Sequence, residues 1–305
     1  MKNQKLSGIL AVIAASLMFG LGYTFGDVVI AEGMSETCNG LWTSIFAVIG
    51  NSVIGIVRKK SPFKKISPRQ TGLCIISGIC AVWLSNLMFL IAYKYMEVAE
   101  VTMLHFLYPS LIAVFMTLAF KEKFTKEKLG AIVCSITGML IITGGFKLGH
   151  PVGLAAAMTT GILYAVYPVM LETTSLKEVE SGTVVMYMNI VGGISALVIS
   201  LATGTFMLPV NATVLLCQIA VSLTSVTGFL LTAYGVKVIG ATNASFGSML
   251  EPIASCIFAA AVLGQKLGKN VLFGAVFIIL SILFTSLHDI RAEQKKHKVQ
   301  TTGEI

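Results

Sequence analysis

The sequence predicts an all-α integral membrane protein with ten transmembrane helices, arranged as two inverted five-helix repeats. The first observation is composition: of 305 residues, 55% are apolar and 12% are charged, with a mean hydropathy of +0.86. Soluble domains carry roughly 25% charged residues, so this chain has too little polar surface for a soluble globule. The other two observations are a series of long apolar runs and an internal repeat.

The apolar runs account for nearly the whole chain and leave no room for a soluble domain. A transmembrane helix needs about 20 mostly apolar residues. The first run is too long for a signal-peptide core and lacks a small-residue cleavage site, so we expect it to be a retained span. The predicted spans are 6–30, 38–57, 71–93, 98–120, 129–146, 152–171, 184–206, 212–236, 241–263 and 271–287.

The positions of lysine and arginine predict the orientation of these spans. Positively charged loops are retained on the cytoplasmic side of a membrane. With the amino terminus inside, all of the 22 basic residues fall in cytoplasmic segments except Lys94, Lys147, Lys266 and Lys269. We therefore expect a multi-pass protein of the cell (plasma) membrane with both termini in the cytoplasm.

The net charge of +8 follows this topology, because the basic residues lie between apolar stretches and form no folded basic face. The expected partners are thus the lipid bilayer and a small-molecule substrate, and not nucleic acid. The basic segment from Arg291 to Lys298 is expected to anchor the chain near anionic lipids.

An internal repeat relates the two halves of the chain. Sliding the chain against itself until Pro109 meets Pro252 also aligns Lys94 with Lys237, Lys123 with Lys266, and Lys126 with Lys269. We call this shift, the number of residues that separates Pro109 from Pro252, the repeat offset. Each half contains five predicted spans, an odd number, so the second half must enter the membrane from the opposite side. The predicted units are a first repeat over 1–148, a second over 149–290, and a basic cytoplasmic tail over 291–305.

Inverted repeats characterise secondary transporters, whose substrate site lies near the bilayer midplane at the interface between the halves. Two similar halves can rock between an arrangement that opens inward and one that opens outward. The sequence therefore predicts a secondary transporter of small polar or amphipathic metabolites that works by alternating access. Because the fused halves already supply the pseudo-dimer, one chain is expected to suffice as a functional monomer.

Both halves resemble a known transporter family. The stretch from Ala92 through Pro109 and the turn Phe120-Lys121-Glu122-Lys123-Phe124-Thr125 to Gly138 is similar to the carboxy-terminal part of an EamA repeat of the drug/metabolite transporter superfamily. The second copy resembles it through Glu251-Pro252, the turn Leu263-Gly264-Gln265-Lys266-Leu267, and Gly274. The resemblance implies a ten-helix permease with a central cavity that exports or exchanges small metabolites, such as amino acids, nucleotide precursors or drugs.

The turn departs from the family pattern in both copies, because Gln265 replaces the usual glutamate and Lys121 replaces the usual glycine. If the acidic residue of the turn pairs with a neighbouring lysine to fix the helix junction, only Glu122 retains that role. We interpret the turn as structural and not as a substrate site.

Glu251 is the principal candidate for a functional residue. It lies ten residues into its span, about 15 Å along the helix axis, and ionisable groups inside spans are functional candidates by default. Pro252 follows and loosens the helix. Two interpretations remain open: a proton-coupling or cation-contacting carboxyl in the cavity, or a carboxyl held by hydrogen bonds at the proline kink.

The other candidates for substrate binding are aromatic or polar side chains within the spans. His105, also a proton-coupling candidate, lies one helical turn before Tyr108, the residue aligned with Glu251 by the repeat. Packing is the competing interpretation for every member of this set. The remaining candidates are Tyr23, Trp83, Asn86, Tyr164, Tyr167 and Ser248.

Other functional classes receive less support. No Cys/His cluster has metal-ligand spacing, there is no P-loop, and a nucleophile with a nearby base is missing, so no metal, cofactor or enzymatic activity is expected. The alternative function is a non-transporting membrane sensor or assembly subunit. Substrate, transport direction and coupling ion stay open at this stage.

Overall fold

A computed structural model describes residues 2–57, 59, 64–145 and 150–302, with side chains described from residue 4 to residue 285 within those ranges. Every regular element in the described part is helical. The elements are α1 (Lys2–Ala31), α2 (Glu36–Val57), α3 (Pro68–Gly78), the π-helix η1 (Ile79–Leu84), α4 (Ser85–Tyr93), α5 (Val98–His105), α6 (Tyr108–Phe120), α7 (Lys126–Thr143), α8 (Pro151–Thr173), the 3₁₀-helix η2 (Ser175–Lys177), α9 (Ser181–Ala202), α10 (Ala212–Ile239), α11 (Ala241–Ser248), α12 (Glu251–Leu263) and α13 (Lys269–Thr302).

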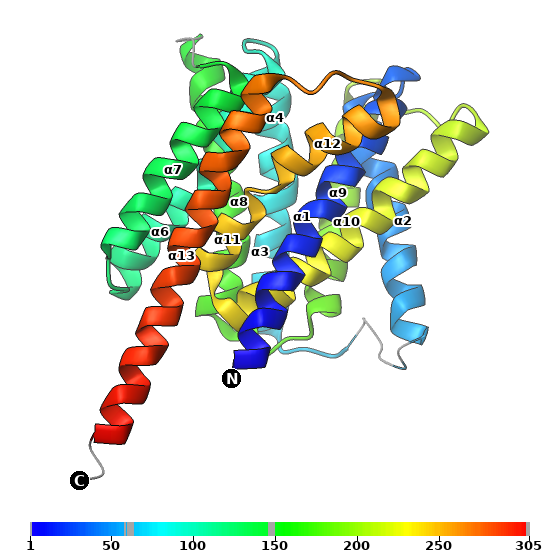
Figure 1. The fold of residues 1–305 in the computed structure, drawn as a ribbon. Helices are drawn as coiled ribbons and strands as arrows, with labels where there is room; N and C mark the ends of the chain where they lie inside the picture. The colour runs from blue at the N-terminus through cyan, green and yellow to red at the C-terminus, as the bar shows by residue number, and fades with distance from the viewer. Residues whose placement is uncertain (1, 58, 60–63, 146–149, 303–305) are drawn as a thin grey trace.

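Eight helical segments in the described residues are long and apolar enough to cross a membrane. Some of them combine two or three elements, such as Pro68–Tyr93, which includes α3, η1 and α4. Two further predicted spans correspond to α7 and to the apolar part of α13, Lys269–Thr285. Both termini lie at the same end of the helical bundle, which we call the N-terminal end (Figure 1).

The fourth and ninth predicted spans are each broken in two near their middle. Helix α5 stops at His105 and α6 starts at Tyr108, while α11 stops at Ser248 and α12 starts at Glu251. A proline occupies the second position of each new helix, Pro109 in α6 and Pro252 in α12. Proline lacks a backbone N–H and its ring displaces the preceding turn, which explains why both spans break there.

The repeat offset relates these broken helices residue by residue. When α5 and α6 are shifted by this offset, their bounds coincide with those of α11 and α12. The ends of α6 and α12 also match, because Lys121 (φ 55°) and Gly264 (φ 68°) both adopt the left-handed conformation. Lys121 thus takes the backbone conformation of the glycine it replaces, although a side chain is disfavoured there.

Several predicted boundaries differ from the observed ones. Helix α9 ends at Ala202, four residues before the predicted end at Phe206, and α7 covers 126–143 where 129–146 was predicted. Phe146 lies outside the described residues. The predicted basic tail from residue 291 is continuous with α13 as far as Thr302, and 303–305 lie outside the described residues.

The two halves pack together through pairs of long helices. Helix α1 packs on α10 and α12, α2 packs on α9, and η1 and α4 pack on α8. Helices α7 and α13 lie side by side at one edge of the bundle (Figure 1). They cross at Gly138 and Gly274, where a Cβ built on either glycine would approach the carbonyl oxygen of the other to within 2.9 Å or less. Small residues at such crossings let two helix backbones approach closely.

The α7–α13 crossing gives a stability prediction. Gly138→Ala is expected to lower the free energy of unfolding by about 1–3 kcal/mol, because the added methyl group has to displace backbone atoms of α13. The measurement is thermal unfolding of the purified protein. The matched control is Gly40→Ala in α2, where nothing lies within 4 Å of the added carbon, so its stability should stay the same or rise by about 0.5–1 kcal/mol. Equal effects at the two positions would contradict the crossing.

Candidate functional site

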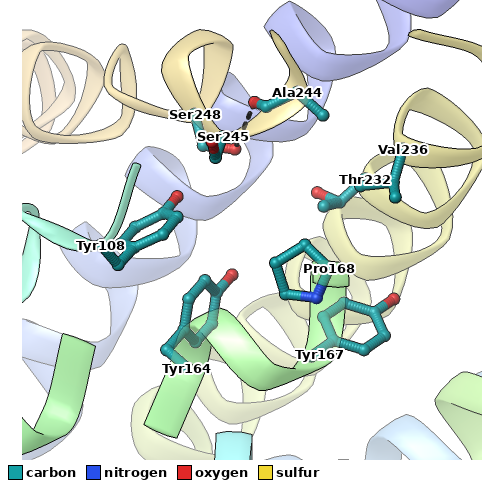
Figure 2. A pocket seen from close by; sticks show the side chains of 9 residues that line it. All are labelled: Tyr108, Tyr164, Tyr167, Pro168, Thr232, Val236, Ala244, Ser245 and Ser248. Atoms are coloured by element: carbon teal, nitrogen blue, oxygen red, sulfur yellow. Dashed lines mark hydrogen bonds between the residues drawn. The ribbon is translucent and has the colours of Figure 1, made fainter. Parts of the chain in front are cut away.

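A small cavity lies where α6, α8, α10 and α11 meet. About 10 Å³ of it is open to the centre of a water molecule, which is close to the space that one water needs. Figure 2 shows side chains from all four helices around it. The lining residues are Tyr108, Tyr164, Tyr167, Pro168, Thr232, Val236, Ala244, Ser245 and Ser248.

The sequence of each helix explains why these side chains meet. Tyr164 and Tyr167 are three residues apart on α8, so they share one face, and Pro168 interrupts the hydrogen-bonding of that helix. Helix α11 presents small residues on the opposite wall, which leaves room for the rings. Tyr108 begins α6 at the break and faces the cavity together with Ser248 of α11.

Two fully buried hydroxyl groups of the cavity wall have no hydrogen-bond partner in the structure. They are the Tyr167 hydroxyl on α8 and the Thr232 hydroxyl on α10, and both residues are at most 5% exposed. By contrast, Ser245 donates to the Thr242 carbonyl at 2.8 Å and Ser248 donates to the Ala244 carbonyl at 3.3 Å. The cavity therefore combines tyrosine rings and apolar walls with two polar groups that remain available.

Glu251 lies next to this cavity at the first position of α12. It is buried, with 4% of its surface exposed, and its Oε1 atom has no hydrogen-bond partner. Tyr23 of α1 interacts electrostatically with its carboxylate. The carboxylate of Glu251 also interacts electrostatically with the hydroxyl groups of Tyr108 and Tyr164. The break before Pro252 thus places a carboxylate beside the tyrosines.

His105 joins the same cluster from the end of α5. Its Nδ1 atom shares a hydrogen bond of 3.1 Å with the hydroxyl of Thr160 on α8. Its ring lies against Tyr164 and Tyr108, at centroid distances of 5.2 and 5.5 Å, and against Phe89 of α4 at 4.9 Å. His105 is therefore both a hydrogen-bonded packing residue and a neighbour of the cavity tyrosines.

The remaining predicted site residues do not line the cavity. Tyr23 is 50% exposed and interacts electrostatically with Glu251. Trp83 lies in the π-helix η1, where its buried indole N–H has no partner, and Asn86 is exposed on α4. Of the nine predicted residues, the structure brings Tyr108, Tyr164, Tyr167 and Ser248 into the cavity wall, with Glu251 and His105 as neighbours.

Sequence reasoning missed five residues of the cavity wall. Thr232 is the most informative of them, because a threonine within a long apolar helix gives no periodic signal of its own. No signal along the chain separates it from other threonines of the same helix, such as Thr224. The others are Pro168, Val236, Ala244 and Ser245.

No three His, Cys, Asp or Glu side chains gather to hold a metal ion in the described part of the chain. Two further carboxylates, those of Asp27 on α1 and Glu36 on α2, interact electrostatically with Tyr93 of α4. Tyr93 in turn interacts with Tyr23, which interacts with Glu251. These acidic groups are thus connected to Glu251 through the two tyrosines.

Polar contacts join the two halves at the N-terminal end of the bundle. Lys128 of α7 is buried and forms a salt bridge of 2.6 Å with Glu122, the acidic residue of the first turn. Thr242 of α11 donates to the same carboxylate at 3.4 Å. The Glu172 carboxylate at the end of α8 accepts a hydrogen bond of 2.5 Å from the Ala241 N–H, the first of α11. These contacts hold α11 against both halves.

The contact between Glu172 and α11 gives a second prediction. Glu172→Gln is expected to destabilise the protein by about 1 kcal/mol, because a neutral amide no longer complements the positive end of the α11 dipole. Thermal unfolding of the purified protein measures this. Glu178→Gln, an exposed position six residues later, is the control and should leave the melting temperature unchanged. A Glu172→Gln protein as stable as this control would show that the contact contributes nothing.

Comparisons with known proteins agree with this architecture. The model of the EamA-like transporter family matches twice, over residues 6–144 and 151–287. Over 260 residues, covering 81% of both chains, this protein is 28% identical to the uncharacterized transporter YyaM of Bacillus subtilis. It is 24% identical to the uncharacterized inner membrane transporter YicL of Salmonella typhimurium, over 93% of this chain and 96% of that protein.

A solved crystal structure shares the fold, with a TM-score of 0.75 and 17% sequence identity over 96% of this chain and 99% of that one. The two family matches together cover most of the 305 residues, one match to each half. The protein is a multi-pass membrane transporter, and it belongs to the EamA-like transporter family.

Proposed function

We propose that this transporter is a secondary permease that moves small polar or amphipathic metabolites, such as amino acids or drug-like compounds, by alternating access. The observation that carries the proposal is the convergence of the two helix breaks on one buried site. Tyr108 and Glu251, aligned by the repeat, begin α6 and α12 beside the same tyrosine-lined cavity. In secondary transporters, broken helices of this kind form the substrate site near the midplane.

The proposed topology has ten spans, with α7 and the first part of α13 as the two beyond the eight long ones. The halves are then inverted repeats over 1–148 and 149–290. Both termini and the basic tail from residue 291 face the cytoplasm of a plasma membrane, as the lysine and arginine bias indicates. One chain acts alone.

The cavity dimensions support a closed conformation of the site. A space for about one water is too small for an amino acid or a drug-like compound, so substrate entry requires helices to move apart. The contacts of Glu122 and Glu172 with α11 hold the N-terminal end together. Alternating access then consists of releasing these contacts while the opposite end closes.

Glu251 is the proposed coupling residue. Within the described part of the chain this buried carboxylate has no cationic partner, and such a group is costly when charged, so it favours binding either a proton or a positively charged group. A substrate whose positively charged group displaces the proton from Glu251 would couple its own transport to a proton gradient. His105 is the second proton-coupling candidate, and Tyr23 and Ser248 complete the proposed contacts with the substrate. Export or exchange is the proposed direction, from the family resemblance.

The first experiment is a thermal-shift screen of the purified protein against amino acids, nucleosides, amines and antimicrobial compounds at two pH values. A ligand that binds the folded state raises the melting temperature by mass action. The best ligand is then tested for uptake into vesicles with and without a pH gradient. Glu251→Gln is expected to lower gradient-driven transport by about tenfold or more, because the amide cannot exchange a proton.

The control for transport is Glu178→Gln, a change of the same chemistry at an exposed position, which should transport as the unmodified protein does. Full gradient-driven transport by Glu251→Gln would rule out this residue as the coupling group. A panel in which no compound binds would favour the alternative of a sensor or assembly subunit.

A further inference from the structure

The repeat supplies an equivalent position in the first half for the residues that line the cavity, and the side chains at these positions differ. The repeat offset aligns Thr232 with Phe89 and Ser248 with His105. In the first half these two rings pack against each other at a centroid distance of 4.9 Å. Aromatic rings therefore fill the space that is open in the second half.

Two hydroxyl groups of the second half stand out beside this open space. The Tyr167 and Thr232 hydroxyls are buried without a partner. An unsatisfied buried polar group costs about 1–3 kcal/mol. The second half thus keeps two costly groups in the cavity wall, and at the position of Thr232 the first half has a phenyl ring.

The chemistry of the wall limits what these two groups can bind. The nine lining residues include no Asp, Glu, Lys, Arg or His, so a charged group inside the cavity would touch no counter-charge in its wall. A hydroxyl accepts and donates hydrogen bonds, and tyrosine rings with Pro168, Val236 and Ala244 supply the apolar remainder. Such a wall suits a small uncharged group with hydrogen-bonding capacity.

We propose that this cavity is an asymmetric specificity subsite that receives an uncharged hydroxyl or amide group of the transported molecule, which Thr232 and Tyr167 recognise by hydrogen bonding. The inference rests on the proposed transport function. Any charged part of the substrate then lies outside the subsite, on the side of Tyr108 that faces Glu251. In the closed conformation a single water fits the same space.

Thiol labelling tests the subsite without a known substrate. The purified full chain carrying Thr232→Cys is reconstituted in lipid vesicles and treated with three methanethiosulfonates: the neutral methyl reagent, a cationic one and an anionic one. Peptide mass spectrometry reads modification at position 232 separately from the six native cysteines. Relative to an exposed position, the neutral reagent should react at least about tenfold faster than either charged reagent, because the cavity offers no counter-charge.

Two variants serve as controls. Glu178→Cys is exposed in the turn between η2 and α9, outside the membrane spans, and supplies the relative rates of the three reagents at an open position. Thr224→Cys replaces a buried threonine of the same helix α10, whose hydroxyl donates to the carbonyls of Ala220 and Val221 at 2.9 Å. This position lies outside the cavity wall and should remain unmodified by all three reagents. If Thr232→Cys fails to fold, Ser245→Cys on the facing wall replaces it.

The outcomes separate the subsite from the transport function. Equal relative rates for charged and neutral reagents would overturn the subsite whether or not the protein transports, and so would the absence of reaction at the cavity position in a protein that transports, because transport requires the closed site to open. The expected labelling pattern in a protein that transports none of the screened compounds would keep the subsite and contradict the proposed function. Once a hydroxylated substrate is found, its transport rate can be compared with that of the analogue lacking the hydroxyl. Thr232→Val should abolish the difference between the two rates, while Thr224→Val should preserve it.

Discussion

The backbone breaks before Pro109 and Pro252 are the constraint on which the rest of the structure depends. Inside a bilayer, unsatisfied backbone groups are tolerated only where protein surrounds them. Each break must therefore be covered by neighbouring helices, and α8 lies against both α5 and α6 on one side and α11 on the other. That covering places Tyr164 and Tyr167 of α8 against the breaks.

The same constraint explains why the site is asymmetric in a protein built from two similar halves. The repeat fixes where the backbone breaks, but the side chains at the breaks differ: Tyr108 in one half and Glu251 in the other. Aromatic packing of His105 with Phe89 fills the space in the first half. Thr232 and Ser248, smaller side chains at the equivalent positions, leave a cavity in the second half.

The family and the order of the helices along the chain could be predicted from the sequence, because both depend on patterns along the chain. The repeat offset aligns the two prolines, and the observed bounds of α5, α6, α11 and α12 follow it. The π-helix η1 has no such signal, because its counterpart in the second half lies within the regular α-helix α10.

The candidate site could be predicted only in part, for a related reason. Tyr164, Tyr167 and Tyr108 stand out in an apolar sequence as aromatic residues beside prolines. A buried hydroxyl without a partner, such as that of Thr232, is a property of the folded neighbourhood and not of the chain. Thr224, on the same helix, would have ranked equally from sequence, although its hydroxyl is satisfied by its own helix.

The two ends of the bundle also differ, and the repeat shows how. At the N-terminal end, Glu122 contacts Lys128 and Thr242, and Glu172 accepts a hydrogen bond from α11. The residues equivalent to Glu122, Lys128 and Thr242 are Gln265, Val271 and Ala99, which cannot form an ion pair with one another. At that opposite end the halves are joined instead by a hydrogen bond of 2.9 Å from the Asn211 amide to the Glu32 carboxylate, which is exposed. Rocking of the halves under the proposed mechanism therefore exchanges contacts of different chemistry at the two ends: a buried lysine paired with a carboxylate at one end, and an exposed amide–carboxylate hydrogen bond at the other. Because these contacts are not equivalent, the two arrangements of such a transporter differ in energy even without a substrate.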